Sequence, residues 1–429
     1  MSESTSVKMP HILYITYHLP TDEEPGAFRP WVEARLLQES GYQVTVITSA
    51  VQYMTGKMIG SGRGWCQEEM REGIRILRVW TVSDHRRSLF RRFLNYSIFA
   101  FLAAVASLRK VPARASYLFA ATDPIFLMPF LLLISILKRI PMVLDERDLF
   151  PETAIAIGVA KESWITRLFY LMQQFMRRRA VSILAATPGI KRRLVSYGHN
   201  PQKIHMLYNG DPYLNVPDGS PLPEQAAQFR KRFRCVACYA GGFGHVNDVG
   251  TIIRAAAELK HRDDLGFLIL GGGERSKEYN DLARELGVAN LIFLGALPRH
   301  TARAVLAACD IGLQALPPNP FFGGTLTSKT FEYFGAGRPL VFAGQGDTTD
   351  LLKESGAGIG VPAENAQEMA TAIARLADDD HLRESMAAAA RKWYERNITP
   401  GNFLRIMQAA MPLPGSAAGM ASPEPQIVH

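Results

Sequence analysis

Short apolar runs alternate with longer amphipathic stretches along the first half of the chain. The stretch from 28 to 40 has helical periodicity and separates the first two of these runs. The runs that predict buried strands cover residues 11–17, 43–49, 74–80, 116–121, 141–145, 181–187 and 204–209. Near-continuous apolar strands with helices between them are typical of a parallel sheet covered on both faces. We therefore predict a doubly wound α/β domain.

The same pattern restarts at Cys235, after a stretch (211–225) whose Pro, Gly and Asp content is typical of a linker. The apolar runs that follow cover residues 235–242, 267–273, 291–295, 311–316 and 339–344. A chain of 429 residues exceeds the size of one ordinary core, so a second doubly wound domain is expected.

These patterns divide the chain near Asn209. We place the first domain at 1–209 and the second at 210–395. A helix at 396–412 is expected to return toward the first domain, and residues 413–429 have the composition of a disordered tail.

Positive charge is concentrated in the first domain. Residues 1–210 hold 27 lysines and arginines against 16 acidic residues, whereas the remainder holds 21 against 24. This excess suits a phosphorylated substrate or an anionic membrane surface. The basic residues lack the interleaved aromatic side chains of a stacking platform, so nucleic acid is not an expected partner.

Two apolar segments, 96–108 and 125–137, are candidates for membrane contact. Each has thirteen residues, too few to cross a bilayer as a helix, which takes about 18 to 20. Basic residues flank both segments: Arg86, Arg87, Arg91, Arg92, Lys138 and Arg139. The alternatives are helices buried in the domain and helices that lie on an anionic membrane. Scattered cysteines and a polar start to the chain favour a cytoplasmic protein. If the two segments do contact a membrane, the protein would be peripheral at the inner face of the cell membrane.

Ligands of open parallel sheets bind beyond the carboxyl ends of the strands, so the loops there are candidate sites. After the first strand, the turn Pro25-Gly26-Ala27 precedes a helix with Arg29 in its first turn, an arrangement that can admit a phosphate. Arg147, Asp148 and Glu152 follow another strand. Such charges are costly unless paired or used, so Arg147 is expected either to serve the site or to pair with Asp148 or Glu152.

In the second domain, glycine-rich turns follow two strands. Gly242 to Gly244, with Phe243 between them, is suited to contacting a diphosphate through main-chain amides, and Gly272 with Glu274 repeats the arrangement one unit later.

The richest segment begins the helix after residue 326. Thr327 and Ser328 are good N-caps, Lys329 lies in the first turn, and Glu332 follows one turn later. Helix dipole, hydroxyls and ammonium converge on a point that suits a diphosphate, and Glu332 can accept hydrogen bonds from a ribose diol.

A pair of cysteines and a run of three aspartates are two patterns that could indicate a metal site. Cys235 and Cys238 have no partner motif at ligand spacing, so they indicate buried thiols in a strand rather than a zinc site. The run Asp378-Asp379-Asp380 is interpreted as a solvated loop between helices. No metal site is predicted.

The segment SKTFEYFGAGRPLVFA (328–343) closely resembles the nucleotide-sugar signature of glycosyltransferase family 4, whose members are retaining enzymes with the GT-B fold. Other motifs agree in order: PGA (25–27), RDLFPE (147–152), YNGD (208–211), YAGGFG (239–244), LILGGGE (268–274), FLGALPR (293–299) and ACDIGLQAL (308–316). The RDLFPE motif resembles the one found in the subgroup that builds bacterial exopolysaccharide and O-antigen chains on lipid carriers.

This resemblance implies two Rossmann-like domains that face each other across a cleft, with C-terminal helices. The second domain would bind a nucleoside diphosphate sugar, with UDP as the expected nucleotide, and the first a polysaccharide or polyprenyl-diphosphate-linked acceptor. Transfer would retain the anomeric configuration and need no cofactor or metal.

The resemblance also implies roles for single residues. Arg147, Asp148, Lys329 and Glu332 are the expected catalytic residues, while Gly26, Ala27, Arg29, Glu152 and Asn209 lie on the acceptor side. Family members often carry a further glutamate eight residues before the one matched by Glu332, but Gly324 stands there. The sugar contacts then fall to the backbone around Gly323, Gly324 and Thr325. Arg275 and Lys329 are candidates to replace the arginine and lysine that many members place after the first strand of the second domain.

Two alternatives remain at this point. UDP-N-acetylglucosamine 2-epimerases share the architecture and need no acceptor, and a scaffold subunit with a degenerate site is conceivable because the first glutamate is missing. Intact Ser328, Lys329 and Glu332 argue against a scaffold.

Overall fold

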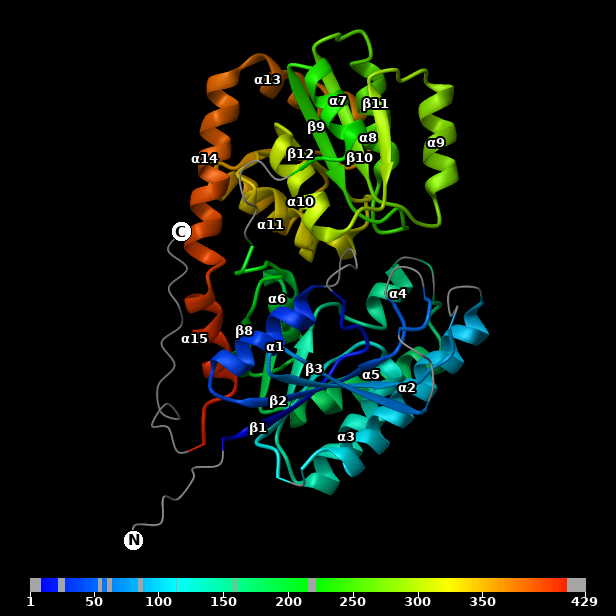
Figure 1. Ribbon diagram of the computed structural model, residues 1–429, viewed down its shortest axis with the longest axis vertical. Coiled ribbons are helices and arrows are strands. Elements are labelled where there is room, and N and C mark those ends of the chain that lie inside the picture. The colour runs from blue at the N-terminus through cyan, green and yellow to red at the C-terminus, as the bar shows by residue number, and fades with distance from the viewer. Residues whose placement is uncertain are drawn as a thin grey trace. The chain divides into compact units, whose positions relative to one another are not determined.

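The computed structural model describes residues 9–21, 28–52, 56–59, 64–83, 88–112, 114–156, 158, 160–214 and 221–414. These residues form two compact units (Figure 1). Among the described residues, the N-terminal unit runs to Tyr208 and includes the segment from Pro400 to Pro414, while the C-terminal unit runs from Asn209 to Thr399.

The N-terminal unit is built on an eight-stranded sheet with the order β3-β4-β2-β1-β5-β6-β7-β8. Its strands are β1 (His11–Ile15), β2 (Gln43–Ser49), β3 (Cys66–Arg71), β4 (Ile74–Val79), β5 (Tyr117–Ala121), β6 (Met142–Glu146), β7 (Ser182–Ala185) and β8 (Ile204–Met206). The pairing is parallel except for β3, which runs antiparallel to β4 at the edge. All residues of β1 and β6 are buried, because helices cover both faces of the sheet.

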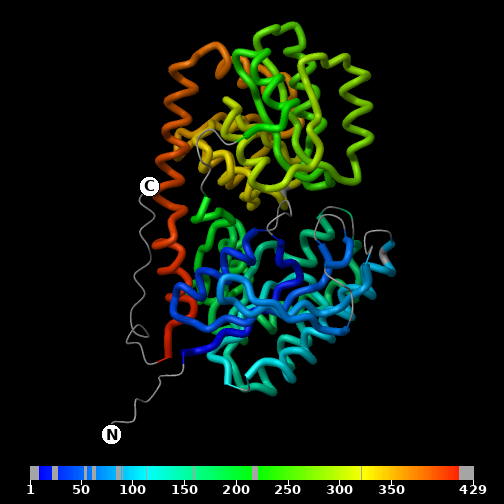
Figure 2. The backbone as a smooth tube through the Cα atoms, viewed as in Figure 1, coloured from blue at the N-terminus to red at the C-terminus, as the bar shows by residue number. Residues whose placement is uncertain are grey.

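Two groups of helices cover this sheet. One contains α2 (Leu89–Lys110), α3 (Met128–Lys138) and α5 (Trp164–Arg179), and α3 packs between the other two. The other contains α1 (Arg29–Glu39) and α15 (Pro400–Ala410), which pack against each other (Figure 2, where red meets blue). The chain steps along the sheet in opposite directions at α1 and at α2, so right-handed crossovers put the two groups on opposite faces. The shorter helices are α4 (Glu152–Ala156) and α6 (Pro188–Ser196).

The C-terminal unit has a six-stranded sheet with the order β11-β10-β9-β12-β13-β14, and all its pairs are parallel. Its strands are β9 (Cys235–Ala240), β10 (Leu265–Leu270), β11 (Leu291–Gly295), β12 (Ile311–Ala315), β13 (Leu340–Ala343) and β14 (Gly358–Val361). Its helices are α7 (Glu224–Arg232), α8 (Val249–Glu258), α9 (Ser276–Glu285), α10 (Arg299–Ala308), α11 (Ser328–Gly335), α12 (Asp347–Ser355), α13 (Ala366–Asp378) and α14 (Asp380–Asn397).

The predicted fold class is confirmed, because each unit is a helix-covered and largely parallel sheet. Every apolar run predicted as a strand contains one. The pattern missed β3, whose residues CQEEMR are polar and only partly buried, and β14, whose four residues GIGV are too short to stand out. Among the described residues, no helix is long and apolar enough to span a membrane.

Candidate nucleotide-sugar site

The order of strands in the C-terminal unit defines where a ligand is expected to bind. β9 and β12 are neighbours, and the chain steps from β9 toward β10 in one direction but from β12 toward β13 in the other. In doubly wound sheets, ligands bind at such a switch point, beyond the carboxyl ends of the two strands. Here these ends lead into the glycine turn after Ala240 and into the segment that enters α11.

The glycine turn is held tightly by its neighbours. A Cβ atom at position 241 would lie 2.0 Å from Cε of Lys329, and one at position 271 would lie 1.8 Å from the carbonyl oxygen of Gly241. Gly271 also has a φ of +130°, which side chains rarely adopt. Glycine is therefore required at position 271, where the clash is with backbone, whereas a side chain at position 241 would displace Lys329.

Two amides of this turn are available to a ligand. The N–H of Phe243 donates to the oxygen of Gly272 at 2.9 Å, and the Phe243 ring is buried in the core. Within the described part of the chain, the N–H groups of Gly242 and Gly244 have no hydrogen-bond partner. A Cβ at either glycine would meet open space. The turn can thus present two amides to an anion, whereas Phe243 supports it from beneath.

Lys329 lies beside these amides. Its Nζ donates to Oδ1 of Asn247 at 3.0 Å, and Nδ2 of Asn247 donates to the oxygen of Gly242 at 3.1 Å. The ammonium also lies 5.9 Å from the centre of the Tyr239 ring. Burial lowers the pKa of Lys329 to about 8. A partly desolvated cation fixed next to free N–H groups is an arrangement that binds a diphosphate.

The start of α11 adds further donors. Thr327 is the N-cap residue and Ser328 the first helical residue, so unpaired N–H groups of the first turn point away from the helix. The Thr327 hydroxyl makes no hydrogen bond to the first turn, and it is buried without a partner among the described residues. The sequence-based expectation of a side-chain cap at Thr327 is therefore wrong, because this hydroxyl is oriented elsewhere.

Glu332 belongs to a cluster of four charged side chains. Its Oε1 lies 3.0 Å from Nη2 of Arg299, and its Oε2 lies 3.1 Å from Nε of Arg303. Asp211 Oδ2 lies 2.9 Å from Nη2 of Arg299 and 2.6 Å from Nη2 of Arg303. Burial alone would lower the pKa of Arg303, but the carboxylates of Glu332 and Asp211 outweigh it and raise that pKa.

Asp211 and Arg299 end two motifs of the resemblance, YNGD and FLGALPR, but no role was predicted for them or for Asn247 and Arg303. Asp211 falls in the stretch interpreted as a linker, yet it is buried in the C-terminal unit. The available signal was the spacing of Arg299 and Arg303, which places both on one face of α10.

The remaining residues predicted to bind the nucleotide sugar differ in the contacts that they make. Gly272 follows β10, and Glu274 is exposed with an oxygen 3.9 Å from His245 Nε2. Gly323 and Gly324 end a short 3₁₀ helix (Pro320–Gly324). The oxygen of Thr325 accepts a hydrogen bond from the Thr348 hydroxyl at 3.0 Å. Arg275, the other candidate cation, pairs with Glu278 at 2.5 Å instead.

In the N-terminal unit, Arg29 occupies the interior. Its guanidinium pairs with Asp145 and with Glu33, each at 2.7 Å, and Nη1 donates to the oxygen of Leu207 at 2.8 Å. Burial and the charge of Asp145 raise the pKa of Glu33 to about 7. Burial alone would also raise the pKa of Asp145, but Arg29 and Arg147 outweigh it and lower that pKa to about 2. The hydrogen-bond donors of Arg29 therefore serve buried groups, and its assignment to the acceptor side stays a prediction.

Arg147 completes this buried network. It pairs with Asp145, and its Nη2 lies 3.0 Å from Oε2 of Glu33 and 3.1 Å from the Tyr14 hydroxyl. The expected alternative partners, Asp148 and Glu152, are not its partners. The side chain of Arg147 is one-fifth exposed, so only part of it faces solvent.

The other predicted acceptor-side residues have separate surroundings. Asp148 is exposed beyond β6, and Oε1 of Glu152 accepts a hydrogen bond from the Tyr197 hydroxyl at 3.1 Å. Asn209 is the first residue of the C-terminal unit. Gly26 and Ala27 lie outside the described residues.

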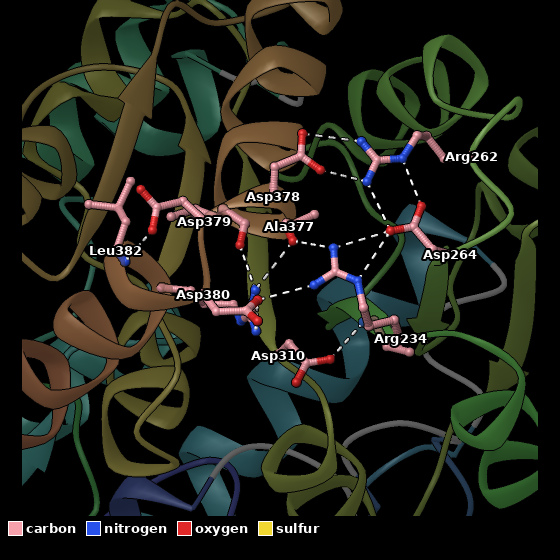
Figure 3. A network of polar contacts seen from close by, with 12 residues as sticks. Arg234, Arg262, Asp264, Asp310, Ala377, Asp378, Asp379, Asp380 and Leu382 are labelled. Atoms are coloured by element: carbon pink, nitrogen blue, oxygen red, sulfur yellow. Dashed lines mark hydrogen bonds and ion pairs between the residues drawn. The ribbon is translucent and has the colours of Figure 1, made fainter.

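The acidic run in the C-terminal unit is used in ion pairs and capping (Figure 3). Asp378 pairs with Arg262 at 2.7 Å, Asp380 pairs with Arg234 at 3.1 Å, and Asp379 accepts the Leu382 N–H at 2.8 Å to cap α14. The interpretation of this run as a merely solvated loop is therefore incomplete. Cys235 and Cys238 are buried free thiols, as predicted.

Comparison with known proteins identifies the class. The model "Glycosyl transferase 4-like domain" matches residues 32–210, and the model "Glycosyl transferases group 1" matches residues 225–393. The solved structure of Anabaena HepE in complex with UDP-glucose is similar in fold, with a TM-score of 0.66 and 15% identity over 94% of this chain and 99% of that one.

Several curated relatives are named D-inositol 3-phosphate glycosyltransferase. The protein of Corynebacterium aurimucosum is 34% identical over 51% of this chain, and the match spans only about half (53%) of that relative's length. The protein of Corynebacterium kroppenstedtii is 24% identical over 87% of this chain and 84% of its own. The chain is thus a glycosyltransferase with the GT-B fold. It belongs to the family 4 type of these enzymes.

Proposed function

We propose that this enzyme transfers a sugar from a uridine diphosphate sugar, bound at the switch point of the C-terminal unit. The observation that carries the proposal is the position of the Lys329 ammonium beside the glycine turn, where the amides of Gly242 and Gly244 are free among the described residues. Its Nζ is held there by Oδ1 of Asn247 at 3.0 Å. UDP is proposed as the nucleotide because a structural neighbour of the same fold was solved with UDP-glucose. Glu332 would accept hydrogen bonds from the ribose hydroxyls.

The proposed chemistry relies on positioning and charge. As the bond between the anomeric carbon and the diphosphate oxygen breaks, negative charge develops on the leaving diphosphate. Lys329, the amides of the glycine turn and the N-terminus of α11 would balance that charge, a task that requires no metal. The acceptor hydroxyl would attack the anomeric carbon from the face that the diphosphate leaves, and the departing diphosphate oxygen would take the proton of that hydroxyl. The anomeric configuration is therefore retained. In this proposal, Arg147 and Asp148 serve the acceptor side.

We propose that the acceptor is carried on a lipid at a membrane surface, and a face of the N-terminal unit supports this. On α5, the side chains of Trp164, Leu168, Leu171 and Phe175 are all exposed. Their spacing places them along one face of the helix, and Trp164 is 76% exposed. Such an apolar face is unfavourable in water and suits the interface of a bilayer.

Neighbouring helices extend this apolar surface. Exposed apolar side chains on α2 and α3 are Phe90, Phe93, Phe101, Leu108, Leu133, Ile136 and Leu137. The two apolar segments are therefore only partly core, since Phe99 and Leu131 of the same helices are fully buried. We call the exposed apolar residues of α2, α3 and α5 the apolar face.

Charge favours an anionic bilayer as the occupant of the apolar face. The sequences of α2, α3 and α5 contain no acidic residue. Basic side chains that are exposed or partly exposed on them are Arg91, Arg92, Arg109, Lys110, Lys138, Arg167, Arg178 and Arg179. Apolar insertion together with basic residues is the combination that binds peripheral proteins to anionic lipid.

A second acceptor class is favoured by the relatives' names. Several curated relatives are named D-inositol 3-phosphate glycosyltransferase, and D-inositol 3-phosphate is a small phosphorylated polyol. The basic N-terminal unit also suits such an anion.

The proposed function is tested by a donor screen followed by product analysis. Nucleotide sugars are screened by thermal shift, since a ligand that binds the folded state raises the melting temperature. The donor that binds is then incubated alone, with D-inositol 3-phosphate, and with polyprenyl-diphosphate-linked sugars in anionic vesicles. A lengthened lipid-linked glycan supports the proposal, and glycosylated inositol phosphate supports the second acceptor. A sugar altered without acceptor indicates an epimerase and contradicts both.

A further inference from the structure

We propose that Asp211 and Arg303 are positioning residues that hold the carboxylate of Glu332 toward the ribose hydroxyls of the donor. This inference rests on the proposed role of Glu332 and concerns how the protein fixes that side chain. The positioning cluster, as we call it, contains Asp211, Arg299, Arg303 and Glu332.

The cluster joins three segments that are distant in the sequence. Asp211 lies just after the start of the C-terminal unit, Arg303 lies on α10 one turn after Arg299, and Glu332 lies on α11. Arg303 bridges the two carboxylates, with Nε 3.1 Å from Glu332 Oε2 and Nη2 2.6 Å from Asp211 Oδ2. One planar guanidinium thus fixes Glu332 relative to Asp211 in a way that a single ammonium cannot.

Asp211 is itself anchored on both its side chain and its main chain. Its Oδ1 accepts the Tyr213 N–H at 3.0 Å, and its main-chain oxygen accepts the Tyr394 hydroxyl of α14 at 2.5 Å. Only 7% of its side chain is exposed. The arginines are therefore held by a fixed anion, and they in turn hold Glu332.

Arg299 occupies a position that is unfavourable for a cation within its own helix. Arg299 is the first residue of α10, and no acidic residue lies in the first turn of that helix. A cation at a helix N-terminus is unfavourable because the dipole is positive there. Two carboxylates from other segments compensate for this placement, so the cluster does not follow from local helix preferences.

Glu332 keeps capacity for a ligand within the cluster. A carboxylate offers about four lone-pair sites. The arginines occupy three through contacts of 3.0, 3.1 and 3.4 Å, and 16% of the side chain is exposed. The carboxylate can therefore be fixed in direction and still accept a hydrogen bond from a ribose hydroxyl.

A test must separate positioning from a purely structural ion pair. We compare the dissociation constants of UDP and 2′,3′-dideoxy-UDP for each variant, because their ratio isolates the ribose hydroxyls. Loss of hydrogen bonds to a charged group should give the wild type a ratio of about 10 to 100. A variant that only weakens the fold changes both constants together and leaves the ratio unchanged.

The variants are Glu332→Gln, Arg303→Met and Asp211→Asn, with Arg284→Met as control. Arg284 is an exposed arginine on α9, paired only with the exposed Asp281 in the described residues. We expect the ratio to fall to within about threefold of unity in Glu332→Gln and Arg303→Met, as expected when a charge-assisted hydrogen bond is lost. It should be reduced in Asp211→Asn and unchanged in Arg284→Met. If Arg303→Met does not fold, Asp211→Asn, which keeps the shape of the side chain, carries the test.

The outcomes distinguish the inference from the proposed function. A ratio that persists in the Arg303 and Asp211 variants but is lost in Glu332→Gln overturns the inference and leaves the ribose role of Glu332 intact. A ratio that persists in Glu332→Gln contradicts that role itself, and the inference falls with it.

Discussion

The side-chain nitrogen of Lys329 lies 3.0 Å from Oδ1 of Asn247, and the amide of Asn247 donates to the oxygen of Gly242 at 3.1 Å. Through Asn247, a lysine at the start of α11 is tied to the glycine turn that follows β9. The two segments follow neighbouring strands of the sheet, β9 and β12, at its switch point. This tie places a cation and two free amides where a parallel sheet binds phosphate.

The affinity for UDP should fall as the pH rises through 8. Burial lowers the pKa of Lys329 to about 8, so the free enzyme loses this cation above that pH. The dissociation constant of UDP should then rise by up to about tenfold per pH unit. Calorimetric titration between pH 7 and pH 9.5 measures it, and Lys329→Met should be flat over the same range. An unchanged wild-type affinity would show that Lys329 does not contact the diphosphate.

Arg29→Met should destabilise the fold strongly. The substitution leaves the carboxylates of Asp145 and Glu33 buried with one cation fewer, which costs about 3 to 5 kcal/mol. Arg35→Met on the same helix is the matched control. Its side chain is one-third exposed, and its pairs with Glu39 and Glu72 are long, so the expected change is within about 0.5 kcal/mol. Urea unfolding measures both, and equal stability of the two variants would contradict the structural role of Arg29.

Variants of the apolar face should lose membrane binding while keeping their stability. The triple variant Trp164→Gln, Leu168→Gln and Leu171→Gln removes exposed apolar area from α5 without altering the core. It should sediment with anionic vesicles far less than the wild type does, and binding of the wild type should fall as salt rises. Met70→Gln, an exposed apolar residue of β3, is the control and should bind normally. If the triple variant sediments with the vesicles as much as the wild type does, the exposed face of α5 does not contact the bilayer.

Transfer should retain the anomeric configuration and survive EDTA. Lys329, the amides of the glycine turn and the α11 N-terminus are proposed to carry the charge of the leaving diphosphate. The proton coupling constant of the new linkage, measured by NMR with and without chelator, reports both properties. An inverted linkage, or activity lost in EDTA and restored by magnesium, would contradict the proposed mechanism.

Much of the fold was predictable because strands that are buried on both faces appear in the sequence as continuous apolar runs. β1 and β6 are buried along their whole length, and their apolar runs are evident. β3 has no such record, because an edge strand with polar side chains resembles a loop.

The candidate site was predictable only where its chemistry is local. Ser328, Lys329 and Glu332 stand in one helical segment, so their common direction follows from helix geometry. Asp211 and Asn247 meet their partners through tertiary contacts across 92 and 82 positions, which no local pattern records. The buried ion pair of Arg29 was missed for the same reason, since its partner Asp145 lies 116 positions away.

Lys329 is proposed to bind the diphosphate of a nucleotide sugar, and this is tested most directly by comparing the binding of UDP with that of uridine. The ratio of their dissociation constants isolates the diphosphate. In Lys329→Met this ratio should shrink by about tenfold or more relative to the wild type, because a charge-assisted contact is lost, while uridine binding and the fold stay unchanged. The same ratio in wild type and Lys329→Met would contradict the account.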